Sequence, residues 1–180
     1  MRQIRKLTID YSLREDRLRA TTLLKDGDGL VMWLTQKLTS RLVKGLVELF
    51  DNTLAVPETP PAAQAAAQPV RERRVAAHFW EQARADLSRV PQRPVPPPRE
   101  STPEVLVDGL RLRQHKDTYF LHFSWGEEAV FLPADETWLR QFMRSLHTLY
   151  RDAEWPVSGL WPVWFDAVEH KHYVRQSEIN

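Results

Sequence analysis

The sequence contains no cysteine, which excludes disulfide bonds, thiolate metal sites and a cysteine nucleophile. It also has no apolar run of the roughly 18 residues that a membrane-spanning helix needs. Residues 1–8 lack the apolar stretch of a secretory signal. We therefore expect a soluble protein in the cytoplasm, a compartment that suits a chain without disulfides.

The motifs of common enzymes are missing as well. The sequence has no phosphate-binding loop, dinucleotide fingerprint, paired-carboxylate signature or Gly-x-Ser-x-Gly element. A calcium loop starting at Asp26 would place Lys37 where a bidentate glutamate is required, so segment 26–29 indicates a turn. His170 and His172 have no third firm metal ligand nearby. We expect no catalytic residues, no metal and no cofactor, and hence a protein that is not an enzyme.

The net charge of +1 is small, but the charges are distributed unevenly. Residues 1–50 hold ten Lys and Arg against six Asp and Glu, whereas residues 101–180 hold eight against twelve. Such asymmetry is typical of a polyanion-binding surface on the basic half, or of two units that attract one another. Ordinary surface variation explains it equally well.

An internal repeat is the most informative positive feature. At an offset of 100, one apolar helical face recurs, and before it, at an offset of 101, alternate strand residues recur. The helical positions are Leu38, Leu42, Leu46, Leu49 and Phe50, matching Trp138, Phe142, Leu146, Leu149 and Tyr150. The strand positions are Leu18, Ala20, Thr22 and Leu24, matching Tyr119, Leu121, Phe123 and Trp125. Two unrelated hairpin-and-helix segments are the alternative explanation.

The repeat predicts an α+β fold of two tandem β-β-β-α units, in which a small antiparallel sheet is covered by one helix. The units are expected at residues 1–52 and 104–155 and are expected to pack as a pseudo-dimer. In the first unit, we place strands near 4–11, 17–24 and 30–34, with Thr35 capping the helix. In the second, residues 105–113 form either one strand or a tight hairpin, and Asp135 caps the helix.

A Pro-rich linker, residues 53–103, separates the units and holds ten of the thirteen prolines. An extra helix is expected at about 70–90, because one stripe of that segment is apolar. The stripe consists of Ala76, Phe79, Trp80, Ala83 and Leu87. This helix either docks a protein partner or covers a face of its own protein.

The tail, residues 156–180, follows Trp155 and is rich in Trp and Pro. Trp161 and Trp164 lie on a stretch where prolines and Gly159 forbid a regular helix. Tryptophan is enriched in interface hot spots, so the three residues are candidate protein-binding anchors together with Phe79 and Trp80. Folding back onto the second unit is the alternative.

The amino-terminal unit has a candidate nucleic-acid surface. Lys6, Arg17 and Arg19 are expected to face away from the helix, and Trp33 joins them if its neighbours point inward. Cations that track phosphates beside rings that stack on bases are typical of single-strand binding. The duplicated strands-then-helix layout resembles that of the PUR and Whirly single-stranded-DNA binders, although those have four strands per unit.

Two functions follow from these surfaces. The first hypothesis is a non-enzymatic binding or adaptor protein that is a subunit of a larger protein complex. The second is a single-stranded nucleic-acid-binding protein.

Overall fold

The structure, a computed structural model, describes residues 1–54, 70–91 and 93–165. Seven strands and three long helices are formed there, with a further helical turn at 163–165. In chain order they are β1 (Arg2–Ser12), β2 (Arg17–Leu24), β3 (Gly29–Leu34), α1 (Gln36–Thr53), α2 (Val70–Leu87), β4 (Glu104–Leu106), β5 (Gly109–His115), β6 (Thr118–Trp125), β7 (Glu128–Ala134) and α3 (Glu136–Asp152). Mixed α and β content is therefore confirmed. The extra helix lies where it was predicted but ends at Leu87.

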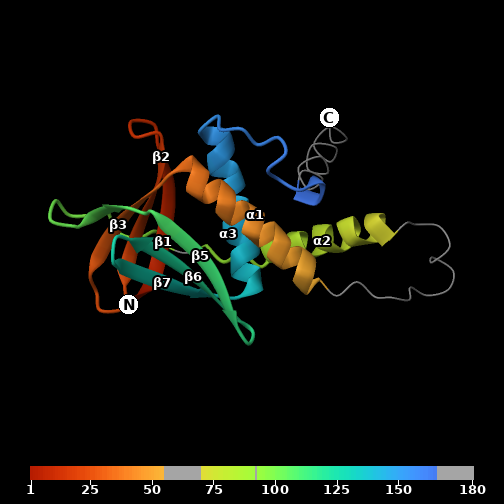
Figure 1. The fold of residues 1–180 in the computed structure, drawn as a ribbon, viewed down its shortest axis with the longest axis horizontal. Coiled ribbons are helices and arrows are strands. Elements are labelled where there is room, and N and C mark those ends of the chain that lie inside the picture. Colours follow the sequence, from red (N-terminus) through yellow and green to blue (C-terminus); the bar gives the residue numbers. More distant parts are fainter. Residues whose placement is uncertain (55–69, 92, 166–180) are drawn as a thin grey trace.

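All seven strands belong to one sheet, in the order β4-β3-β2-β1-β7-β6-β5. The prediction of two small sheets is wrong in this respect. Strands β1, β2 and β3 form one antiparallel group and β5, β6 and β7 form another. The two groups are joined because Arg2 and Gln3 of β1 pair in parallel with Val130 and Phe131 of β7. In Figure 1 the sheet lies at the left, α1 and α3 cross it, and α2 extends away to the right.

The sheet curls until its two edges meet at one short piece of chain. β4 pairs in parallel with β3 at one edge, while β5 pairs with β6 at the other. Only Val107 and Asp108 separate β4 from β5, and the N–H of Val107 donates to Trp33 O, whereas that of Asp108 donates to Ser124 O. The alternative of a hairpin centred on Asp108 and Gly109 is therefore wrong. The chain changes strand partner there instead.

Alternate strand residues and one face of each of two helices fill a single core. Leu18, Ala20 and Leu24 of β2 are at most 1% exposed and belong to the same cluster as Leu46 of α1 and Leu146 of α3. The period of two in the strands and the four-residue spacing in the helices are what this burial requires. Most apolar positions of the repeat are thus core positions, and Leu49, Trp125, Trp138 and Leu149 are partly buried against that core.

Side-chain caps begin both helices as the sequence predicts. Thr35 Oγ1 accepts a hydrogen bond from the N–H of Leu38, and Asp135 Oδ1 accepts one from the N–H of Trp138. The second bond, at 2.7 Å, is accepted by a carboxylate at the positive end of α3. None of the helices in the described residues is long and apolar enough to cross a membrane.

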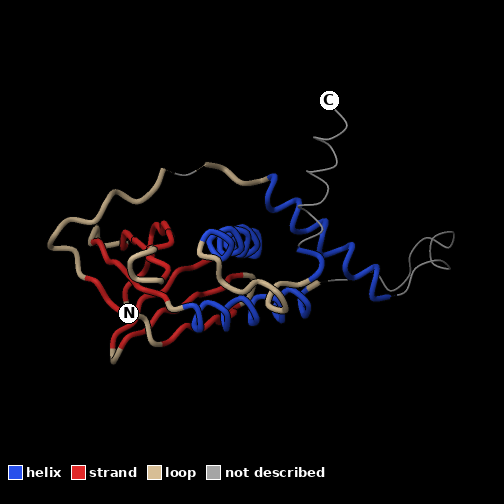
Figure 2. The backbone as a smooth tube through the Cα atoms, turned by 90° about the horizontal axis from the view of Figure 1, so that it is seen from above, coloured by secondary structure: helices blue, strands red, loops and turns tan. Residues whose placement is uncertain are grey.

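The part of the linker between α2 and β4 runs along the outside of the sheet. Figure 2 shows it as a long loop that passes from the end of α2 around the molecule to β4. The N–H of Val95 donates to Thr8 Oγ1 at 2.8 Å, and Pro103 O accepts from Val31 N–H. The loop is therefore attached to β1 at one end and to β3 at the other.

Candidate binding surfaces

The tryptophans of the tail are buried in the protein's own core. Trp155, Trp161 and Trp164 are 7%, 7% and 4% exposed. Trp155 Nε1–H donates to Asp16 Oδ1 at 2.9 Å, and its ring packs edge-on against Tyr150 of α3. Folding back, one of the two predicted alternatives, is thus the arrangement in the structure. Partner contact through these rings would require the tail to leave its place.

Asp16 holds the tail against the turn between β1 and β2. Its carboxylate accepts hydrogen bonds from both Trp155 and Tyr11, and these bonds lower the pKa of Asp16. The residue has a positive φ of 47°, which Asp tolerates better than most residues. The turn and the tail are therefore held together by one exposed carboxylate.

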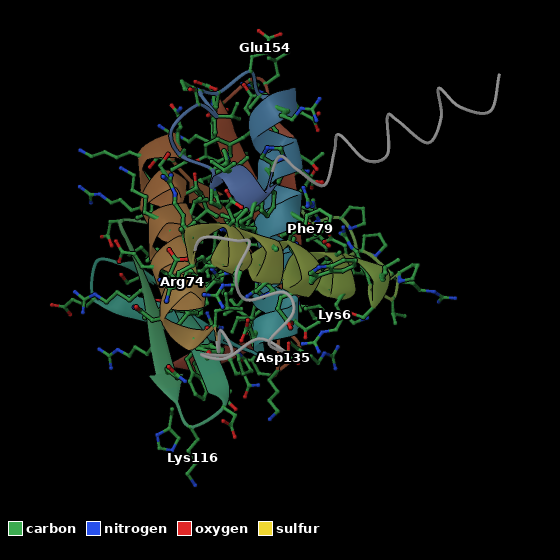
Figure 3. All side chains as sticks on the ribbon, turned by 90° about the vertical axis from the view of Figure 1, so that its right-hand side faces the viewer. Lys6, Arg74, Phe79, Lys116, Asp135 and Glu154 are labelled. Carbon is green, nitrogen blue, oxygen red and sulfur yellow. The ribbon has the colours of Figure 1, made fainter. Side chains whose placement is uncertain are left out.

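Helix α2 docks on α3 through polar side chains. Gln82 Nε2 donates to Arg140 O at 3.1 Å, and Asp86 forms an ion pair with Arg144 at 3.1 Å. Gln141 Nε2 donates to Ala85 O at 2.7 Å. Figure 3 shows α2 crossing in front of α3, with Phe79 labelled on it.

The buried face of α2 carries a histidine near the middle of the helix. His78 is 1% exposed, lies 2.8 Å from Asp51 of α1 and stacks on Trp164 with a centroid distance of 4.9 Å. Burial lowers the pKa of His78, and this effect outweighs the hydrogen bond and charge of Asp51, which raise the pKa. The neutral imidazole is favoured in the folded protein.

Because the polar face of α2 points inward, part of its apolar stripe points outward. Trp80 is 67% and Leu87 is 88% exposed, while Phe79 is half-buried and packs edge-on against Trp80 at 5.6 Å. Val90, just beyond the helix, is 74% exposed. We call Trp80, Leu87 and Val90 the α2 apolar face.

The predicted basic face of β1–β3 is only partly available. Arg19 and Trp33 lie directly opposite each other on neighbouring strands, as a common surface requires. However, Arg19 lies 3.9 Å from Asp10, and Trp33 Nε1–H donates to Glu104 at 2.9 Å. Arg17 is half-buried. The structure brings these residues together but gives two of them acidic neighbours.

Lys6 lies apart, at a groove between β1 and α3 that sequence reasoning missed. This groove, which we call groove 1, has a volume of about 420 Å³. Its floor is formed by Trp138, stacked on Phe142 at 4.9 Å, and by Leu149. Four consecutive strand residues, Lys6, Leu7, Thr8 and Ile9, form one wall, and Arg89, Val90, Arg93 and Pro94 of the linker form the rim.

A second groove of about 400 Å³ lies at the matching place in the repeat, between β5 and α1. Five α1 positions in groove 2 match α3 positions in groove 1 at the offset of 100 found in the sequence. The α1 residues are Arg41, Leu42, Gly45, Glu48 and Leu49, and the α3 residues are Gln141, Phe142, Ser145, Thr148 and Leu149. The repeat is the sequence signal that would have indicated both grooves.

The described residues hold no cluster of three or more His, Cys, Asp or Glu side chains suited to a metal ion. His170 and His172 lie outside the described residues. Comparison with known proteins adds no function to the surfaces above, because no family model, no curated protein and no solved structure matches the chain.

Proposed function

We propose that this protein is a non-enzymatic binding or adaptor protein and a subunit of a larger protein complex. The observation that carries the proposal is the α2 apolar face. A helix normally turns its apolar residues inward, because burying a large apolar side chain stabilises the fold by about 1.5–3 kcal/mol. Here Trp80 and Leu87 remain in solvent although α2 is firmly docked. Exposed apolar faces of this kind are typical of protein interaction sites.

The α2 apolar face is also well placed for a partner. The polar contacts of Gln82 and Asp86 with α3 hold the helix on the body of the protein, so Trp80 is presented on a rigid element. A fixed aromatic anchor loses little conformational entropy on binding. The tail tryptophans are engaged in the core, and they are weaker candidates for the same role.

The test is quantitative capture of partners from the cells that make the protein. The double variant Trp80→Gln and Leu87→Gln should recover specific partners at least about fivefold less than the wild type, since an exposed Trp in an interface contributes more than 1 kcal/mol. Folding of the variant is checked by circular dichroism and is expected to be unchanged, because both side chains are exposed.

The matched control is Leu13→Gln, which removes an 84%-exposed apolar side chain from the turn between β1 and β2. It should recover the same partners as the wild type. Undiminished recovery by the Trp80 and Leu87 variant, or recovery of no specific partner by the wild type, would refute the adaptor proposal.

As a finer proposal for the fold, the two β-β-β-α units are related by an internal pseudo-twofold axis. The parallel pairing is reciprocal: the first strand of each unit meets the third strand of the other, at Arg2 with Val130 and at Glu104 with Val31. Two matching grooves support the same relation. On this view, the chain is a pseudo-dimer within one shared sheet.

Single-stranded nucleic-acid binding is the second candidate, and the opposed positions of Arg19 and Trp33 favour it. If it is correct, a labelled oligonucleotide binds at low salt, and Arg17→Ala with Arg19→Ala reduces the slope of log affinity against log salt by about one per lost phosphate contact. The control is Arg84→Ala, an exposed arginine of α2. Absence of binding at low salt would exclude this function.

A further inference from the structure

We propose that groove 1 binds an extended acidic peptide of a protein partner, which adds as a strand to the open edge of β1. The proposal rests on the proposed function as a binding protein and names the chemistry of one ligand. The two surfaces share only Val90, which belongs to the α2 apolar face and also lies at the rim of groove 1. The tests of the two proposals change different residues, so the proposals fail independently.

The hydrogen-bonding capacity of β1 supports strand addition. Its pairing with β7 covers only Arg2 and Gln3, whereas its pairing with β2 continues to Ser12. Backbone groups of an antiparallel strand point alternately toward and away from the partner strand. In the part of the chain that the structure describes, the stretch from Lys6 to Ser12 therefore has β2 as its only strand neighbour, with one edge left for another strand.

This edge faces the groove. Four consecutive residues of β1, from Lys6 to Ile9, line groove 1. Side chains of consecutive strand residues point to opposite faces, so a run of four indicates that the strand edge itself forms the wall. In groove 2 only alternate residues of β5 take part, namely Leu110, Leu112 and Gln114. That wall consists of one face of β5.

The apolar floor of groove 1 also supports strand addition. Trp138, Phe142 and Leu149 of α3 lie opposite the β1 edge, with Val90 and Pro94 at the rim. An extended ligand paired with β1 would place every second side chain toward α3. Strand addition typically gains affinity from main-chain hydrogen bonds and specificity from pockets for alternate side chains. Groove 1 offers both elements.

The charge of groove 1 selects the chemistry of the ligand. Among the described residues, Lys6, Arg89 and Arg93 are the charged residues that line groove 1, and none of its lining residues there carries a carboxylate. In groove 2 the charged residues are Arg41 and Glu48, which oppose each other in sign. Lys6 and Arg93 are exposed, so they are available to an acidic ligand. The charge complementarity therefore selects an acidic peptide, and it selects groove 1.

A single-stranded nucleic acid fits the same groove less well. One face of the Trp138 ring is already stacked on Phe142, with an interplanar angle of 14°. Single-strand binding relies on several rings that stack on successive bases. A strand edge, in contrast, matches the backbone of a peptide. We therefore assign the groove to a peptide and treat nucleic-acid binding as an outcome of the test.

The test uses a fluorescein-labelled peptide of about eight residues, a typical strand length, in which Val and Glu alternate. Binding is followed by fluorescence anisotropy at low salt. The full-length protein should bind this peptide, and the double variant Lys6→Glu and Arg93→Glu should raise Kd about tenfold or more. The groove 2 variant Arg41→Glu is the matched control and should change Kd by less than about twofold.

Backbone methylation of the peptide tests the strand geometry. An added strand donates the N–H groups of alternate residues to its neighbour. N-methylation of all Val residues or of all Glu residues should therefore abolish binding in one case and leave it nearly unchanged in the other. A ligand held only by charge would respond equally to both changes.

Each remaining outcome contradicts the proposal. No binding at about 1 mM peptide, equal binding of a Val-Lys peptide, or an equal response of Arg41→Glu would each refute the assignment. Binding of an eight-nucleotide oligothymidylate in place of the peptide would assign the groove to nucleic acid instead. Loss of partners on changing Trp80 and Leu87 remains a separate result.

Discussion

At the scale of single residues, the most informative group is the buried polar cluster where α1, α2, α3 and the tail meet. His78, Asp51 and Trp164 come from three different segments, and His78 contacts both of the others directly. Arg140 is 1% exposed, forms an ion pair with Glu136 and places its guanidinium 4.2 Å from the centre of the Phe50 ring. Polar groups buried in this way need partners, so the cluster fixes how the segments fit together.

His78 predicts a pH dependence of stability. The folded state lowers its pKa below the ordinary value of about 6.5, mainly through burial, with Arg140 and Arg74 acting in the same direction and Asp51 opposing them. The unfolded state therefore binds the proton more tightly. The stability that neutral His78 contributes is complete above about pH 6.5 and is lost as the pH falls through 6.5 toward the folded pKa.

Urea unfolding between about pH 7.5 and 5.5 measures this effect. The free energy of unfolding should decrease on acidification, and His78→Gln should make the decrease smaller. His122, whose pKa is also lowered by burial, leaves a residual slope. The control is His115→Gln, which changes an exposed side chain at the end of β5. An unchanged slope in His78→Gln would contradict the assignment.

At the scale of elements, α2 shows that a sequence pattern can predict that a helix exists but not which of its faces is buried. The sequence predicted the helix and its apolar stripe. The buried face instead contains His78, Gln82 and Ala85. Gln82 and His78 find partners on α3 and α1, at positions distant in the chain. Periodicity cannot reveal such partners, because it reports only how apolar residues are spaced.

The change of strand partner between β4 and β5 also depends on contacts between residues distant in the chain. Segment 105–113 reads as one strand or one hairpin, because local residues alone define both. The structure keeps the chain extended and divides its pairing between β3 and β6. This choice depends on the sheet curling until its edges meet, which is a property of the whole fold. Strand positions were predictable, whereas the single sheet was not.

Gly109, the first residue of β5, allows a test of this change of strand partner. A Cβ atom there would collide with Ser124 Oγ on β6. Gly109→Ala should destabilise the protein by about 1 kcal/mol, because overpacking a tight contact costs roughly 1–3 kcal/mol and the hydroxyl can rotate away. Ser124→Ala alone should cost little, since its hydroxyl forms only a long 3.4 Å hydrogen bond to Asp108.

A double-mutant cycle measured by thermal or urea unfolding completes the Gly109 test. Ser124→Ala removes the atom that the new methyl group meets, so the double variant should be more stable than the sum of the single effects indicates. Gly45→Ala in α1 is the control, because its Cβ would meet nothing within 4 Å. Additive effects at 109 and 124 would contradict the close approach of β5 and β6 at this position.

At the scale of the whole molecule, the repeat predicts core positions correctly, although the two-sheet architecture inferred from it is wrong. Most of the matched apolar positions are core residues in both halves, as Leu46 and Leu146 show. The prediction of two separate sheets is wrong because the residue pattern of each half does not indicate which strand its first strand will pair with. Grooves 1 and 2 follow from the same repeat, and their different charges arise where the copies diverge. Lys6 and Arg93 have no charged counterparts among the residues lining groove 2.

The shared sheet predicts that both halves unfold together. β1 and β7 are paired, β3 and β4 are paired, and one core includes residues of both halves, among them Leu18 and Leu121. Leu18→Ala in β2 should destabilise the protein by about 3 kcal/mol, because Leu18 is 0% exposed and truncation leaves a cavity.

Five of the seven tryptophans follow residue 104, so fluorescence reports mainly on the second half. We expect Leu18→Ala to shift the urea midpoint equally in tryptophan fluorescence and in circular dichroism, whereas the exposed-site control Leu13→Ala shifts neither. A fluorescence midpoint that stays at the wild-type value would mean that the halves unfold separately despite their common sheet.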